Sequence, residues 1–146
     1  MFILDYLFGK KKFVEIPKIG VFEARVRNHN VKKNTWVTTI SIKDYADEIV
    51  IILDGDANAP EKKQVESVIW IIENLKEIDK EVIAGINRNR KLTDKFNKYD
   101  VNDLRLSDVN PYDAYLNSYD VSYSLKSNEE IGVSVIIQNN KVLEIE

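Results

Sequence analysis

The sequence predicts an α+β fold, in which one long helix packs on one face of an antiparallel sheet with four strands before the helix and three after it. Apolar and polar residues alternate over Ile19–Arg27 and Trp36–Lys43, which is typical of strands with one buried face. Between about Pro60 and Arg90 the apolar spacing changes to three and four, as in an amphipathic helix. The alternation then returns near the end of the chain. A chain of 146 residues is expected to form one domain, residues 1–146.

The four strands expected before the helix differ in character. Phe13–Ile16 is a short apolar run that Pro17 ends, because proline lacks the N–H group that a ladder needs. The two alternating segments follow it. Ile49–Leu53 is an unbroken run of Ile, Val and Leu, which predicts a strand buried on both faces near the centre of the sheet.

The predicted helix has a start signal and a clear apolar stripe. Asn58 and Pro60 are typical of a side-chain cap and a first-turn proline. Gly85 weakens the last turns, so the helix can end before Arg90. The side chains expected to face the sheet are Val65, Ile69, Ile72, Leu75 and Val82.

Residues 92–118 form the least regular segment, and Asn110-Pro111 indicates a turn within it. Three alternating strands follow. A one-residue slip would move every side chain to the other face, so the apolar positions favour three-residue loops. The pairs expected from these loops are Leu125 with Ile131, Tyr123 with Val133, Ile137 with Leu143 and Val135 with Ile145.

The composition restricts the chemistry and the location. The chain has no Cys and one His, so it lacks a disulfide framework and most zinc, redox and thiol chemistry. The apolar run at Phe2–Phe8 is too short to span a bilayer, and lysines follow it instead of preceding it. We therefore expect a cytoplasmic protein and no membrane attachment. The N-terminal segment is expected to pack on the sheet or on a partner.

Two segments resemble functional sites but lack essential parts. Asp54, Asp56 and Asn58 match the first, third and fifth positions of a calcium loop. Ala59 and Val65 occupy the sixth and twelfth positions, where such a loop requires Gly and Glu. His29 has no neighbouring carboxylate that would make it a general base. The sequence therefore predicts no metal, no cofactor and no catalytic residue.

Charge is unevenly distributed along the chain. Residues 1–43 contain nine Lys or Arg against three Asp or Glu, whereas residues 99–146 contain three against nine. Within residues 99–120, tyrosines are interleaved among the acidic residues, which suits docking on a basic protein. The same residues also suit a solvated connector whose rings cover the end of the helix. The candidate partner-binding residues are Asp100, Asp103, Asp108, Tyr112, Asp113, Tyr115 and Tyr119.

The order of elements through residue 91 resembles a family of small bacterial domains of unknown function. The segments that carry the resemblance are "LFGKKK", "IGVFEARV", "NTWVTTISI", "IVIILDGD" and "VIWIIENL". Val37 departs from the pattern, in which Gly follows the Trp. Some members of that family are immunity proteins encoded beside polymorphic toxins, which implies a toxin as partner.

Three functional hypotheses follow. The leading one is a non-enzymatic protein-binding module, of the immunity type, that binds and neutralises a basic toxin domain and does not bind nucleic acid. The second is a small-ligand or hydrolytic domain with a carboxylate pair in a pocket between sheet and helix. The third is a structural homodimer that uses the apolar N-terminal segment.

Overall fold

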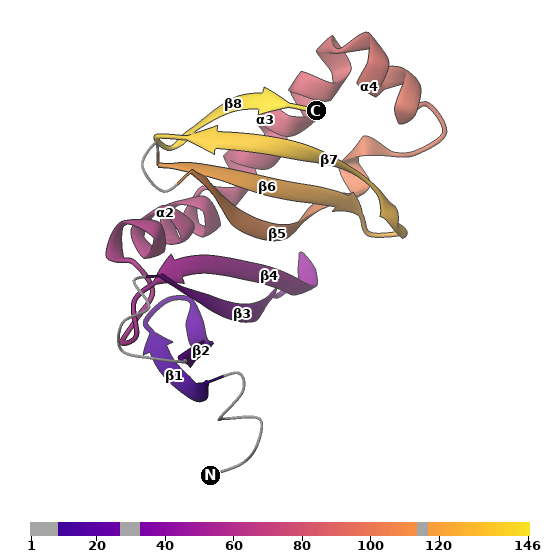
Figure 1. Ribbon diagram of the computed structural model, residues 1–146. Coiled ribbons are helices and arrows are strands. Elements are labelled where there is room, and N and C mark those ends of the chain that lie inside the picture. The colour runs from indigo at the N-terminus through magenta and orange to yellow at the C-terminus, as the bar shows by residue number, and fades with distance from the viewer. Residues whose placement is uncertain (1–8, 27–32, 114–116) are drawn as a thin grey trace.

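A computed structural model describes residues 9–26, 33–113 and 117–146. The described chain forms one eight-stranded mixed sheet with three α-helices (Figure 1). The elements are β1 (Lys10–Ile16), β2 (Gly20–Val26), β3 (Asn34–Ile42), β4 (Ala46–Gly55), α2 (Lys62–Glu73), α3 (Leu75–Arg88), α4 (Arg90–Lys95), the 3₁₀ turn η1 (Val101–Asp103), β5 (Leu104–Asp113), β6 (Ser118–Leu125), β7 (Asn128–Gln138) and β8 (Lys141–Ile145).

The sheet consists of two antiparallel meanders joined side by side. The strands lie in chain order from β1 to β8, and every neighbouring pair is antiparallel except β4 and β5. A parallel pair needs a long crossover connection, which the helices between these two strands supply. The expected arrangement of four strands, one long helix and three strands is therefore wrong: the sheet is mixed, it has an eighth strand, and the helix is divided.

The strand absent from our prediction is β5, which lies at the centre of the sheet. Its pairing with β6 shifts between Leu106 and Asp108 and again between Pro111 and Asp113. Each irregularity adds a residue, so the apolar side chains Leu104, Leu106 and Val109 do not follow a period of two. The second irregularity also accommodates the proline that had indicated a turn.

Two asparagines divide the predicted helix. Asn74 separates α2 from α3, and its backbone N–H and its side-chain amide both donate to the Trp70 carbonyl, at 2.9 and 2.8 Å. Asn89 caps α4 by accepting from the Leu92 N–H at 3.2 Å. The first helix begins at Lys62 without a side-chain cap, because Pro60 still belongs to a bridge with Gly55. The bonds of Asn74 and Asn89 show how asparagine side chains compete with the hydrogen bonds within a helix.

Gly85 does not end α3, which continues to Arg88. A Cβ atom at this position would lie 2.2 Å from Cδ1 of Ile145 in β8. The missing side chain thus lets the helix approach the last strand closely, which explains a glycine inside a helix.

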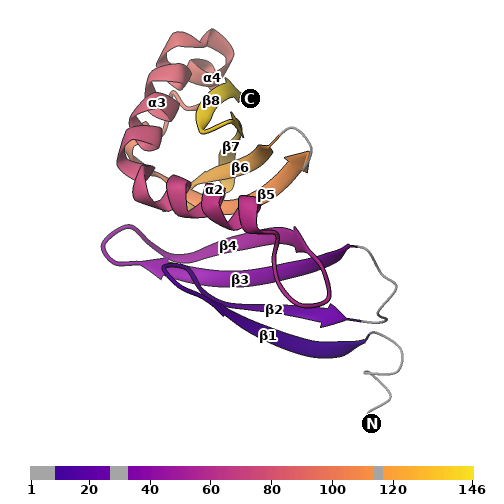
Figure 2. The same cartoon turned by 90° about the vertical axis from the view of Figure 1, so that its left-hand side faces the viewer.

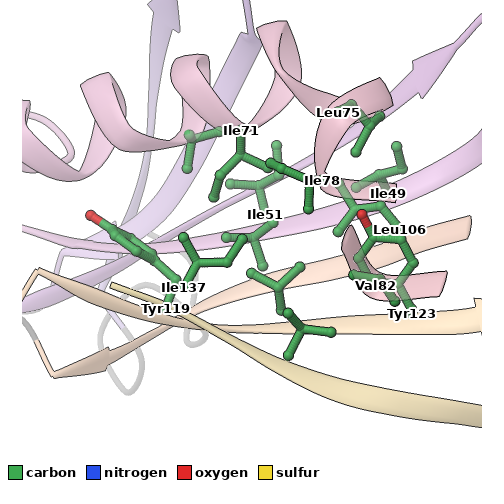
Figure 3. Close-up of a cluster of buried hydrophobic side chains, with 14 of the residues drawn as sticks. Ile49, Ile51, Ile71, Leu75, Ile78, Val82, Leu106, Tyr119, Tyr123 and Ile137 are labelled. Carbon is green, nitrogen blue, oxygen red and sulfur yellow. The ribbon is translucent and has the colours of Figure 1, made fainter. Parts of the chain in front are cut away.

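The helices bury a different face from the predicted one. Val65, Ile69 and Ile72 are only partly buried, whereas Leu75 and Val82 are buried as expected. The buried stripe also contains Val68, Ile71, Ile78 and Ile86. Figure 3 shows Ile71, Leu75, Ile78 and Val82 of this stripe. They face Ile49 and Ile51 of β4, Leu106 of β5 and Tyr119 and Tyr123 of β6.

The two C-terminal hairpins have the expected pairing in their bodies and tighter turns at their ends. Tyr123 pairs with Val133, and Val135 with Ile145, as predicted. The other two pairs are wrong, because Leu125 pairs with Asn128 and Ile137 with Val142. Each hairpin closes through a shorter turn, and a bulge restores the register of the body. In the second turn, Asn139 and Asn140 both have positive φ, which suits a type I′ turn.

The loop between β4 and α2 covers the β1–β3 end of the sheet. The Trp36 indole N–H donates to the Asp56 carbonyl at 3.0 Å, and the Lys12 ammonium donates to the Ala57 carbonyl at 3.0 Å. Gly55 lies so close to the Trp36 ring that a Cβ would be 2.6 Å from it. This loop therefore seals the part of the core that the helices do not reach. None of the described helices has the length and apolarity needed to cross a membrane.

Candidate functional site

One face of the sheet carries the helices, and in the described ranges no helix lies on the other (Figure 2). Residues paired across neighbouring strands point to the same face. One row, Ile51, Val109, Val121 and Val135, is buried under the helices. The adjacent row points the opposite way and consists of Val50, Asp108, Ser122 and Ser134. We call the helix-free side the open face.

The open face is acidic and rich in hydroxyl groups over β5–β8. Beyond Ser134, the row continues to Glu146 through two backbone hydrogen bonds of 2.9 and 2.8 Å. A second row consists of Asn110, Asp120, Ile136 and Glu144. In these two rows, β5 and β6 each contribute one carboxylate, β8 contributes Glu144 and, just past its end, Glu146, and β7 contributes none.

Two adjoining cavities form a groove along β5 on this face, with volumes of about 450 and about 680 Å³. Both are lined by Ser107, Asp108, Ser124 and Glu129. Basic side chains are present at the rim, since Lys95 lines the first cavity and Arg105 and Lys126 line the second. A groove with a hydroxyl and carboxylate floor suits hydrogen-bond donors and cations.

The two aspartates of the open face are held by neutral donors. The Asn110 amide donates to Asp108 at 3.2 Å, and the Ser134 hydroxyl donates to Asp120 at 2.5 Å. Neither carboxylate has an ion-pair partner within the described part of the chain. A side-chain hydrogen bond with Glu144, and the charge of Glu144, raise the pKa of Glu146. Among the described residues, no ion pair therefore compensates the charge of Asp108 and Asp120.

The β1–β4 half of the open face is more apolar. Phe13, Val37 and Ile52 lie in one row with Glu23. Phe13 and Val21 are 60% and 53% exposed, which is unusual for large apolar side chains on a strand. The open face therefore combines an apolar region with an acidic one.

The structure separates the seven predicted partner-binding residues. Asp100 and Asp103 lie at one end of β5, where they accept from the backbone N–H groups of Asn102 and Ser127, at 2.9 and 3.0 Å. Asp108 lies at the middle of β5 on the open face.

The remaining members lie towards the other end of β5 or beyond it. Tyr112 is 66% exposed, whereas Tyr119 is only 2% exposed and belongs to the core. Asp113 ends β5, but its side chain is outside the described part of the structure, as are Tyr115 and His29. Asp108 is thus the one described member of the predicted set that the pairing places on the open face.

The acidic turn that resembles a calcium loop makes local hydrogen bonds. Asp56 accepts from the N–H groups of Asn58 and Ala59, at 2.7 and 3.0 Å, and these bonds lower its pKa. Asp54 accepts from the Gln64 amide at 3.1 Å and pairs with Lys33 at 3.5 Å. These contacts fix the start of the crossover to the helices.

A buried polar cluster lies on the helix side of the sheet. Asp79 of α3 accepts from the hydroxyl groups of Tyr123 and Tyr45, at 2.6 and 3.1 Å. The Tyr45 oxygen in turn accepts from the Leu106 N–H at 2.7 Å, and Arg105 lies 5.4 Å from the Tyr45 ring centre. Asp79 is therefore held by two tyrosine hydroxyl groups, and among the described residues no second carboxyl group joins it in the pair that a hydrolytic site would need.

Asp79 should make stability depend on pH. Burial raises the pKa of Asp79, and the hydrogen bonds from Tyr123 and Tyr45 only partly oppose this effect. The folded chain then binds more protons than the unfolded chain between about pH 4 and the raised pKa, so this contribution to stability falls as pH rises through that window. Urea unfolding of the wild type and of Asp79→Asn, which keeps the acceptor oxygen, should show a stability difference that favours the variant increasingly with pH. A pH-independent difference would contradict this assignment.

Sequence reasoning missed most of the open face although its signal is present. Ser122 and Ser124 alternate with the apolar side chains of β6, and Gly132 and Ser134 do so in β7. Such alternation shows which residues face away from the core, but it does not show that their neighbours in β5 are also polar. The row is completed by β5, whose strand character its sequence does not reveal.

We compared the chain with models of known protein families, with curated proteins and with solved structures, and none of them matches it.

Proposed function

We propose that this chain is a non-enzymatic protein-binding module whose open face binds a basic protein. The observation that carries the proposal is the helix-free side of the sheet, on which carboxylates without ion-pair partners in the described ranges adjoin an exposed apolar region. A cationic partner would neutralise Asp108, Asp120 and Glu144, and its lysine or arginine side chains fit the polar groove along β5.

The size of the open face suits such an interface. Eight strands at a spacing of about 4.8 Å span roughly 34 Å, and the strands, of 5 to 11 residues, are roughly 17–36 Å long. This is enough for a standard interface, which needs about 800 Å² on each partner. The apolar region around Val21 and Val37 would supply the dry centre of the contact, where most binding energy is concentrated.

The acidic region disfavours nucleic acid as the partner, because phosphates would be repelled by the carboxylates of β5–β8. A basic, nucleic-acid-binding protein fits better, since its own binding surface is positive. A toxin nuclease is a basic protein of this kind. The open face and the family resemblance of residues 1–91 therefore support the same, more specific version of the proposal. In that version the chain is a cytoplasmic immunity protein that covers the basic surface of a toxin.

The test uses the product of the reading frame that flanks the gene, with association and dissociation rates measured by surface plasmon resonance. Replacing Asp108 with Asn and Glu144 with Gln together should slow association about threefold to tenfold at low salt and flatten its salt dependence. Replacing Val21 with Ser should mainly speed dissociation, about fivefold for each kcal/mol lost.

A matched control neutralises two exposed carboxylates of the helices, Glu66→Gln with Glu81→Gln. The proposal predicts that this control associates as the wild type does. Equal slowing by the control pair, or rates unaffected by both open-face variants, would contradict the proposed surface. Failure of the flanking product to bind at all would contradict the immunity version.

A further inference from the structure

The outer edge of β1 lies at one end of the sheet. In the described part of the chain, no strand pairs with this side of Lys10–Ile16. An edge strand presents unpaired N–H and C=O groups and is a template for pairing with another strand. The charges on this edge indicate which strand it fits.

The edge is complementary to itself in one antiparallel register. If two copies pair with Phe13 of one opposite Phe13 of the other, Lys11 of each copy lies opposite Glu15 of its mate. Lys10 and Lys12 then lie opposite Ile16 and Val14. Two cross-strand ion pairs form, and no lysine lies directly opposite another lysine.

Other registers are penalised by the same residues. Centring the pairing on Lys11 places Lys10 opposite Lys12, and centring it on Val14 places Phe13 opposite Glu15. Glu15 has no ion-pair partner among the described residues, and Lys12 is already bound to the Ala57 carbonyl on the helix side. Within one copy, the Lys11 ammonium lies 3.9 Å from a carboxylate oxygen of Glu23. This contact is weak and leaves Lys11 able to pair with Glu15 of a second copy.

The opposite edge of the sheet lacks this complementarity. In β8, a pairing centred on the exposed Leu143 places Lys141 opposite Ile145 and Val142 opposite Glu144. Each glutamate would then face a valine instead of a lysine. The β1 edge is therefore the better surface for a second copy.

We propose that two copies of this chain form a weak two-fold dimer by antiparallel pairing of their β1 strands, centred on Phe13. A two-fold axis perpendicular to the sheet keeps both open faces on the same side. The exposed Phe13 side chains of the two copies then lie opposite each other at the centre of the dimer. This assembly goes beyond the proposed function and does not depend on the identity of any basic partner.

Charge reversal tests the register. Sedimentation equilibrium of the full chain should give a dimer dissociation constant of roughly 10–100 µM, because pairing of one short strand buries less than a standard interface. Either Lys11→Glu or Glu15→Lys alone should weaken the dimer about tenfold, since each places like charges opposite each other twice. The double variant should restore the wild-type constant. An equimolar mixture of the two single variants should also associate, because each copy then complements the other.

A second measurement locates the edge without relying on charge. The chain contains no Cys, so Phe13→Cys and the control Leu143→Cys each introduce a single thiol. Mild oxidation at the same chain concentration should cross-link Phe13→Cys much faster than Leu143→Cys. A chain that stays monomeric up to several hundred micromolar, an unaltered dimer in both charge variants, or faster cross-linking at Leu143 would each overturn the proposal.

Discussion

Replacing Trp36 with Ala should lower the free energy of unfolding by about 3–5 kcal/mol, the typical cost of truncating a buried aromatic residue. Trp36 is fully buried, and its indole N–H holds the Asp56 carbonyl of the loop that seals the β1–β3 end of the core. The substitution removes the ring and leaves that carbonyl without this donor. Chemical denaturation followed by circular dichroism measures the change.

Tyr112→Ala is the matched aromatic control, because its ring is 66% exposed on β5. It should change the free energy of unfolding by no more than about 0.5 kcal/mol. Equal effects of the two truncations would show that Trp36 does not contribute to the core in the way described.

Ile71→Ala should cost about 2–5 kcal/mol, and its neighbour Ile72→Ala clearly less. Ile71 is 1% exposed and packs between α2 and the sheet (Figure 3). Ile72 is only partly buried. The two variants remove the same atoms from adjacent positions, so their difference reports the rotation of the helix about its axis. A larger loss at Ile72 would mean that α2 is rotated about its axis, so that Ile72 and not Ile71 faces the sheet. That result would support the buried stripe expected from the sequence.

The sequence predicted the elements with strong periodicity and failed where local interactions interrupt it. Seven strands, the helical segment and the body of both C-terminal hairpins follow from residue spacing. The break at Asn74 does not, because a hydrogen bond from its side chain to the Trp70 carbonyl decides it. Neither does β5, whose two irregularities hide the alternation of Leu104, Leu106 and Val109.

The candidate site was less predictable than the fold. Clustering of Asp and Tyr along the chain suggested a surface, but Tyr119 belongs to the core, and Asp103 binds the Ser127 N–H. The open face is instead assembled from positions far apart in the sequence, such as Val50, Asp108 and Ser134. Such a row is determined by the pairing between strands and cannot be predicted from the sequence of any single segment.

The most direct test of the open face is nuclear magnetic resonance mapping of the isotope-labelled chain with the product of the flanking reading frame. If the open face binds the partner, the largest shifts on binding should occur at Asp108, Ser122, Ser134 and Glu144, with smaller ones at Val21 and Val37. The outward side chains of α2 and α3, such as Glu66 and Glu81, should be unaffected. Shifts concentrated on those helices, with the β5–β7 rows unchanged, would contradict the assignment of the binding surface to the open face.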